Sequence, residues 1–111
     1  MRPTRLLTVA ILPLALGAAP LAAAADGAVS SGEQTVAHVC SVCHEQGLLG
    51  APQIGDASAW KARLDRAGSV DRLAESAANG RGNMPPRGGQ PGLSNDDLKA
   101  AIRYMLSLSG A

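Results

Sequence analysis

The chain has 111 residues, with 10 lysines and arginines against 9 aspartates and glutamates, and its formal net charge is +1. Aromatic residues make up only 2% of the sequence, and it contains no cluster of basic residues. Nucleic-acid binding, which needs a basic surface and aromatic side chains for stacking, is therefore not expected.

The first 25 residues have the order of a secretory signal peptide. Arg2 and Arg5 form a short positive region, an apolar run starts at Leu6, and small residues lead up to Ala25. This order predicts export to the periplasm with cleavage after Ala25, or one residue earlier. The alternative is an uncleaved membrane anchor, because the uncharged run is long enough to span a bilayer. The two prolines within the run and its alanine-rich end favour cleavage.

The remaining part, residues 26–111, is expected to form a single domain. Cleavage after Ala25 leaves 111 − 25 = 86 residues, with 10 − 2 = 8 basic and 9 acidic side chains, so the net charge becomes about −1. The chain has one Trp, one Tyr and no Phe. A domain this small buries little surface and usually needs an additional staple. These numbers favour a core that is filled by a cofactor.

A first amphipathic helix is predicted from Gly32 to Gly47, after a frayed leader at residues 26–31. Its apolar positions recur at spacings of three and four residues, as a helix requires: Val36, Val39, Cys40 and Cys43. The loop 48–55, which contains Pro52, follows this helix.

This helix contains the run Cys40-Ser41-Val42-Cys43-His44. A C-x-x-C-H run is the attachment site of a c-type haem. Two thiols three residues apart lie on one face of a helical turn, where each can form a thioether with a haem vinyl group. His44 then lies under the porphyrin, with an imidazole nitrogen directed at the iron.

Three other interpretations of the two cysteines are open. A thioredoxin-like redox pair would need a flanking βαβ pattern, which is missing here. A disulfide between Cys40 and Cys43 is compatible with their spacing. A zinc site with His38 and His44 would place four ligands within seven residues, which matches none of the usual zinc spacings.

Two short helices are predicted next. Asp56 or Ser58 caps a helix that runs through Trp60 to Gly68. Ser69 caps a third helix, which ends at Asn79-Gly80.

A loop rich in Gly and Pro, residues 80–93, leads to the last helix. Ser94 and Asp97 have the spacing of a capping box. One apolar stripe is expected to face the core of the domain: Leu98, Ala101, Ile102, Met105 and Leu108. The sequence shows neither alternating strand segments nor internal repeats. It therefore predicts a small all-α fold of about four helices wrapped around one haem.

Met84 is the predicted second axial ligand of the iron. It lies in a loop without helical periodicity, and Pro85 and Pro86 directly after it stiffen the backbone. Met105 lies on the apolar stripe and is expected to pack in the core, which makes it the runner-up. His38 shares a helix with His44 and cannot reach the opposite face of the haem, so a surface or haem-edge position is expected. Ligation by His and Met raises the reduction potential.

Several segments resemble the class I c-type cytochromes, and the cytochrome c5 group in particular. The resemblance covers about residues 32–108, and it rests on these strings: Cys40-Ser41-Val42-Cys43-His44, Gly50-Ala51-Pro52-Gln53-Ile54-Gly55-Asp56, Trp60, Asn79-Gly80 and Asn83-Met84-Pro85-Pro86.

The resemblance implies a role for each of the matching site residues. Cys40 and Cys43 would carry the thioethers, and His44 and Met84 would ligate the iron. The carbonyl of Pro52 would accept a hydrogen bond from the other ring N–H of His44. The resemblance places Trp60 near a haem propionate, and simple core packing is an equally good interpretation of this residue.

The chain departs from this resemblance after the Met84 loop. Many relatives of the c5 type have a second, disulfide-forming cysteine pair there, and Gln90 and Leu93 occupy the corresponding positions. We therefore expect packing and turn geometry to hold this loop, and the Met84 segment to be less rigid than in those relatives.

The sequence thus predicts a periplasmic monohaem electron carrier that is not an enzyme, a monomer or weak dimer. The loops 47–53 and 81–90 would frame the haem edge, where redox partner proteins or membrane respiratory complexes make contact. Arg81, Arg87 and Lys61 would make this rim positive, or else form an ordinary solvated surface. The alternatives are a haem peroxidase or gas-binding protein with a labile Met84, and a dedicated subunit of an oxidase, reductase or dehydrogenase complex.

Overall fold

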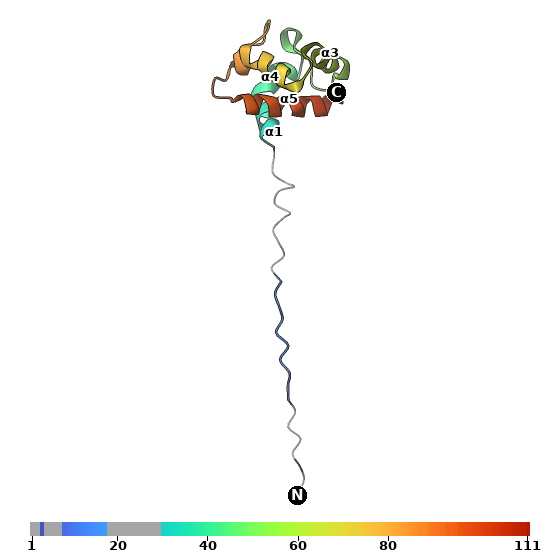
Figure 1. Cartoon of the computed structure of the whole chain (residues 1–111), viewed down its shortest axis with the longest axis vertical. Helices are drawn as coiled ribbons and strands as arrows, with labels where there is room; N and C mark the ends of the chain where they lie inside the picture. The colour runs from blue at the N-terminus through green and yellow to red at the C-terminus, as the bar shows by residue number, and fades with distance from the viewer. Residues whose placement is uncertain (1–2, 4–7, 18–29) are drawn as a thin grey trace.

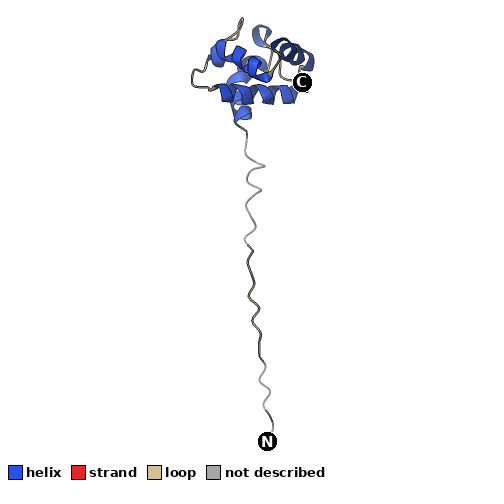
Figure 2. Ribbon diagram, in the orientation of Figure 1, coloured by secondary structure: helices blue, strands red, loops and turns tan. Residues whose placement is uncertain are grey.

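The computed structural model describes residues 3, 8–17 and 30–111. Its regular elements in these ranges are helices (Figure 2), and an isolated bridge between Arg81 and Met84 is the β-type pairing that they contain. Residues 8–17 have no regular secondary structure. The predicted cleavage site after Ala25 lies outside the described residues. Across the described ranges, no helix combines the length and apolar character needed to cross a bilayer.

The first helical segment consists of three parts. α1 (Ser31–Thr35) leads into a π-helical turn, η2 (Val36–Cys40), and then into α2 (Ser41–His44). The sequence predicted one regular helix here, and its spacing gave no sign of the π-helical turn. In this turn the N–H of Ser41 donates to the carbonyl of Val36, five residues back. Such turns often occur at functional sites.

Ser30 begins this segment as the N-cap residue. Its hydroxyl accepts a hydrogen bond from the N–H of Glu33 at 3.1 Å. The prediction of a frayed leader up to residue 31 is therefore wrong at its end, because the serine satisfies a free N–H of the first turn. Residues 26–29 lie outside the described residues.

The caps of the other helices agree with the prediction, with Asp56 rather than Ser58 as the cap of the helix that contains Trp60. Asp56 caps α3, Ser69 caps α4, and Ser94 caps α5 through a capping box with Asp97. A side-chain oxygen placed before a helix satisfies a free backbone N–H of the first turn, so these boundaries follow from local sequence. The bounds are α3 (Ala57–Ala67), α4 (Val70–Asn79) and α5 (Asn95–Ser109).

α5 is the centre of the domain, since α1 and α4 both pack against it (Figure 1). α1 comes close enough that a Cβ on Gly32 would lie within 3.0 Å of the Ala100 carbonyl, so only glycine fits there. The predicted stripe on α5 is wrong at Leu108, which is 50% exposed, whereas Leu106 is buried. The core is formed by Val36, Trp60, Ala74, Ala77, Ala101, Ile102, Met105 and Leu106.

Two irregular loops complete the domain. The first follows α2 and contains the 3₁₀ turn η3 (Leu48–Gly50), and the second joins α4 to α5 and contains η4 (Pro86–Gly89). Each has one non-glycine residue with positive φ: Leu49 at 53° and Arg87 at 56°. The first loop follows His44 and the second contains Met84, so the two predicted iron ligands depend on their conformations.

Candidate functional site

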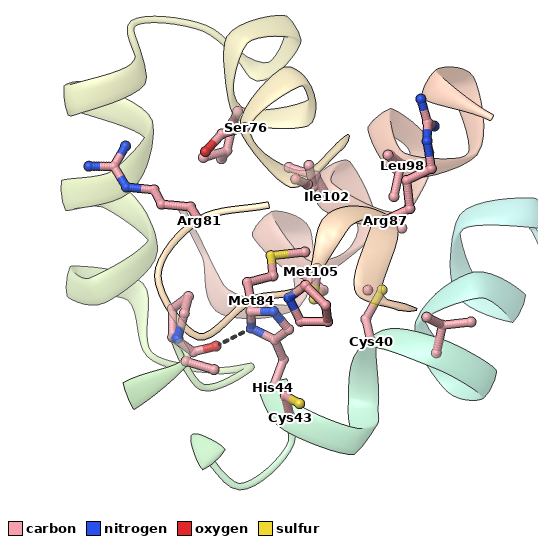
Figure 3. Close-up of a pocket in the computed structure, with 18 of the residues that line it drawn as sticks. Cys40, Cys43, His44, Ser76, Arg81, Met84, Arg87, Leu98, Ile102 and Met105 are labelled. Carbon is pink, nitrogen blue, oxygen red and sulfur yellow. Dashed lines mark hydrogen bonds between the residues drawn. The ribbon is translucent and has the colours of Figure 1, made fainter. Parts of the chain in front are cut away.

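A cavity of about 480 Å³ lies between the helices and the two loops. Its lining comes from the segment that contains Cys40 and Cys43, from both loops, and from α3, α4 and α5 (Figure 3). Apolar side chains dominate this lining, and the volume is typical of a site for a small organic ligand. The cavity agrees with the expectation that a cofactor, and not large aromatic side chains, fills the core of the domain.

His44 projects from the end of α2 into the cavity and is 7% exposed. Its Nδ1 lies 2.8 Å from the carbonyl oxygen of Pro52, the bond drawn in Figure 3. Because a carbonyl can only accept, Nδ1 carries the proton and donates. The N–H of Ile54 also donates to the His44 carbonyl at 2.8 Å, which joins the loop to the helix end.

The pKa of His44 is lowered from its ordinary value. Burial is the largest cause, the hydrogen bond to Pro52 opposes it, and the positive charge of Arg63 lowers the pKa further. The ring is therefore neutral near pH 7. With Nδ1 protonated, Nε2 keeps its lone pair, which is the form that ligates a metal.

Cys40 and Cys43 line the same cavity as free thiols. Burial raises the pKa of Cys40 to about 11, so this thiol is not the activated, low-pKa nucleophile of a thioredoxin-like pair. Within residues 30–111, no group of three or more His, Cys, Asp or Glu side chains could hold a metal ion, which speaks against the zinc interpretation.

Met84 reaches the cavity from the second loop, whereas His44 reaches it from the end of α2 (Figure 3). Its N–H donates to the Arg81 carbonyl at 2.9 Å, and its carbonyl accepts from the Arg81 N–H at 3.0 Å. Met105 belongs to the core and is 3% exposed, as expected, although its side chain also contributes to the cavity wall. Met84 is the thioether that the second loop presents to the cavity.

Two further contacts fix the approach to Met84. The Nδ2 group of Asn83 donates to the Leu49 carbonyl at 3.2 Å, which connects the two loops. Gly80, with φ of 79°, lies so close to the segment that a Cβ would be 2.9 Å from the Pro86 ring and 3.0 Å from the Met84 carbonyl. Neither contact was predictable from the sequence pattern.

Trp60 is 3% exposed and packs beside His44, with ring centroids 5.4 Å apart. Its indole N–H donates to the Gln53 carbonyl at 3.0 Å. Because this donor already has a partner, the geometry favours the core-packing interpretation over a propionate contact. The side chain also forms part of the cavity wall.

Four arginines lie on the cavity wall: Arg63, Arg66, Arg81 and Arg87. Arg81 and Arg87 were expected at the rim together with Lys61. Lys61 instead pairs with Asp65 at 2.7 Å on the exposed side of α3. Arg63 and Arg66 were missed. The signal for Arg63 was its position three residues after the buried Trp60, on the same face of α3.

The remaining candidate, His38, lies exposed on the rim of the cavity. This agrees with the surface or haem-edge position that was expected.

These residues fit a c-type haem. The cavity offers an apolar lining for a flat macrocycle, two thiols for its vinyl groups, a neutral imidazole and a thioether for iron, and arginines for carboxylates.

Comparison with known proteins gives the same result. Residues 27–105 match the family described as cytochrome C oxidase, cbb3-type, subunit III. Cytochrome c5 of Azotobacter vinelandii is 45% identical over 82 residues, which are 74% of this chain and 99% of that protein. Cytochrome c5 of Ectopseudomonas mendocina is 42% identical over 87 residues, 78% of this chain and all of that protein.

A solved structure is also similar. It is the cytochrome c in a crystal structure of an electron-transfer complex of nitrite reductase with cytochrome c. The TM-score is 0.66 at 36% sequence identity, with 73% of this chain and 96% of that chain covered.

Proposed function

This chain belongs to the small monohaem c-type cytochromes, which transfer electrons through one covalently attached haem c, and on this premise we propose that His44 and Met84 ligate the iron of an exported single-electron carrier. The haem supplies the one-electron couple between ferric and ferrous iron. The protein residues hold it, orient the ligands and exclude other ligands.

One observation carries this proposal: the 2.8 Å hydrogen bond from His44 Nδ1 to the Pro52 carbonyl. It fixes the tautomer that leaves Nε2 free to bind iron, and it orients a ring that burial keeps neutral. Such a bond is the usual support of a histidine that ligates a metal.

Met84 is proposed as the other ligand because it is the methionine in a loop. Its backbone is paired with Arg81 on one side and followed by Pro85 in an extended conformation, with φ of −69° and ψ of 155°. Met105 is held within the core by the packing of α5. If His44 and Met84 both ligate the iron, no position would remain open for oxygen or peroxide, so electron transfer without substrate chemistry is the proposed activity.

Export to the periplasm is part of the proposal. The family match begins at residue 27, two residues after the cleavage site predicted from the sequence. Ser30 begins the first described helix shortly afterwards. Both observations support a leader that ends near Ala25 and does not belong to the folded domain.

Redox partner proteins are proposed to dock over the apolar rim of the cavity. Val42, Leu48 and Leu49 line the cavity and are 70%, 51% and 69% exposed. Exposed apolar side chains in one place mark an interaction site on a protein of this size. The first loop and the end of the C-x-x-C-H run supply these side chains.

A second candidate role rests on the family match to subunit III of cbb3-type oxidase. The same iron site would serve a cytochrome that delivers electrons to one terminal oxidase. Co-purification with such a complex at physiological salt would favour this dedicated role over a free carrier.

The proposed function is tested on the protein exported by a host that can attach haem. We expect an intact mass equal to residues 26–111 plus one haem, and a pyridine haemochrome spectrum of the two-thioether type. The reduced protein should not bind carbon monoxide, because His44 and Met84 would both be bound to the iron. Rapid carbon monoxide binding at neutral pH would contradict the His/Met proposal and favour a gas-binding protein or peroxidase.

A further inference from the structure

We infer that Arg87 is a positioning residue, whose guanidinium braces the second loop and thereby holds Met84 in place. The inference rests on the proposed ligation by Met84 and names the side chain on which that ligation depends. Arg87 Nη1 donates to the carbonyl of Leu93 at 2.7 Å, in a partly buried position on the cavity wall.

The backbone of Arg87 is strained. Its φ of 56° and ψ of 28° lie in the left-handed region, where Leu49 is the only other non-glycine residue in the described part of the chain. A residue with a side chain costs free energy in this conformation, whereas glycine adopts it freely. Gly88 and Gly89 follow directly, so the turn is rich in glycine except at this position. The side chain at Arg87 therefore has a function that offsets the strain.

That function follows from what the hydrogen bond connects. The turn after Met84 is closed by Gly88 N–H donating to the Pro85 carbonyl at 3.0 Å. Arg87 lies inside this turn, and its guanidinium reaches forward to Leu93, the residue before the N-cap of α5. The Arg87 hydrogen bond thus spans residues 87–93, a segment in which the backbone hydrogen bonds close only short turns.

The far end of the brace is a fixed point. Ser94 caps α5 through two hydrogen bonds with Asp97, of 2.9 and 3.0 Å, and Leu98 in the first turn is 3% exposed. A charged donor to a carbonyl makes one of the stronger hydrogen bonds of a protein. Through Arg87, the rigid start of α5 limits the movement of Pro85 and hence of Met84.

The experiment compares three variants of the holoprotein. Arg87→Gln removes the guanidinium, and Arg87→Gly removes it and also the backbone strain. Arg72→Gln is the control, because it removes one positive charge from an exposed position of α4 outside the cavity lining. The readouts are the affinity of the ferric protein for imidazole, which competes with Met84 for the iron, and the Met–iron charge-transfer band in the near infrared.

Both Arg87 variants should bind imidazole about tenfold more tightly, since the lost hydrogen bond to a charged donor no longer holds Met84 against the competitor. Arg72→Gln should bind imidazole within about twofold of the wild type. Global unfolding is measured in parallel. For Arg87→Gly, in which the strain is relieved, the free energy of imidazole binding should change by more than the free energy of unfolding.

The inference is overturned if both Arg87 variants bind imidazole like the wild type. It is also overturned if Arg72→Gln increases the affinity equally, which would make the net charge rather than the brace responsible. These outcomes leave the proposed ligation intact, provided that the wild type shows the Met–iron band. A wild type without this band overturns the ligation by Met84 and the inference together.

Discussion

The two predicted ligands of the iron are supported in different ways. His44 ends a continuous helical segment, lies 7% exposed beside Trp60, and has its ring fixed by the Pro52 carbonyl. Met84 lies in a loop between α4 and α5 and depends on a few discrete bonds, including those made by Asn83 and Arg87. His44 is thus held mainly by the helical segment and by a backbone carbonyl, whereas the Met84 loop depends on individual side chains in addition to its backbone turns.

Replacing the imidazole should have the largest effect. His44→Ala removes the ligand that follows the two cysteines, and we expect the yield of stable holoprotein to fall to background because neither the haem nor the first loop keeps its anchor. Haem stain and absorbance of the exported protein measure this. His38→Ala is the matched control on the same segment and should give normal yield, since this residue is exposed on the rim. Normal holoprotein from His44→Ala would contradict the assignment of the imidazole side.

Replacing the sulfur should leave a haem protein with altered properties. Met84→Ala should lose the Met–iron band and bind carbon monoxide when reduced. Its reduction potential should fall by roughly 0.1–0.3 V, a part of the range that axial ligands span. Met105→Leu is the control, and it should keep the band at a stability cost of about 1 kcal/mol, since it exchanges side chains of similar volume. If the two variants showed the reverse pattern, Met105 would be the ligand.

Substitutions at two glycines distinguish the stability of the whole domain from the local support of Met84. Gly32→Ala would push α1 away from Ala100 on α5, so we expect a loss of about 1–3 kcal/mol in global stability. Gly80→Ala would place a Cβ against the Pro86 ring and the Met84 carbonyl at a φ of 79°. Gly80→Ala should weaken the Met–iron band at denaturant concentrations well below those that unfold the protein. Gly32→Ala should lose the band only as the protein unfolds. Denaturant titrations followed at this band and by far-ultraviolet circular dichroism compare the two.

The apolar rim offers a further comparison on the His44 side. Leu48 and Leu108 have almost the same exposure, 51% and 50%, but only Leu48 lines the cavity. Leu48→Asp should lower the second-order rate of electron transfer to a protein partner about tenfold, and Leu108→Asp should change it less than twofold. Equal effects of the two substitutions would remove the rim as the docking surface.

The smallest effect concerns the start of α5, which supports the Met84 loop. Hydrogen bonds from Ser94 lower the pKa of Asp97 below its ordinary value of 3.8. A lowered carboxyl pKa stabilises the fold above pH 3.8, and this stabilisation is lost as the pH falls through the folded-state pKa. Thermal unfolding of Asp97→Ala should therefore occur at a lower temperature than that of the wild type at pH 7, and the gap should close at acid pH. A gap independent of pH would show that the charge has no part in it.

Local sequence was sufficient for much of this picture. The caps at Asp56, Ser69 and Ser94 were predictable because each acts within three residues of its position. The attachment run was predictable because its chemistry requires fixed spacing. The π-helical turn before Ser41 was not, because no residue pattern encodes the insertion.

The support of Met84 was beyond the reach of sequence patterns for another reason. The bond from Asn83 to Leu49 connects residues 34 positions apart, and the brace from Arg87 depends on a backbone conformation that favours glycine. The absence of cysteines in this loop was visible, and the expectation of packing and turn geometry was right but incomplete, since a guanidinium bond is added. The stripe on α5 failed at Leu108 because the helix turns that residue outward near its end.

The central claim is that the sulfur of Met84 completes the coordination of the iron opposite His44. An NMR spectrum of the reduced holoprotein, labelled with ¹³C at the methionine methyl groups, tests it most directly. A methyl group held against the haem face is shifted far upfield by the ring current. We predict one such methyl resonance, and its loss in Met84→Ala. A spectrum without an upfield methyl, or one in which the shifted methyl belongs to Met105, would contradict the claim.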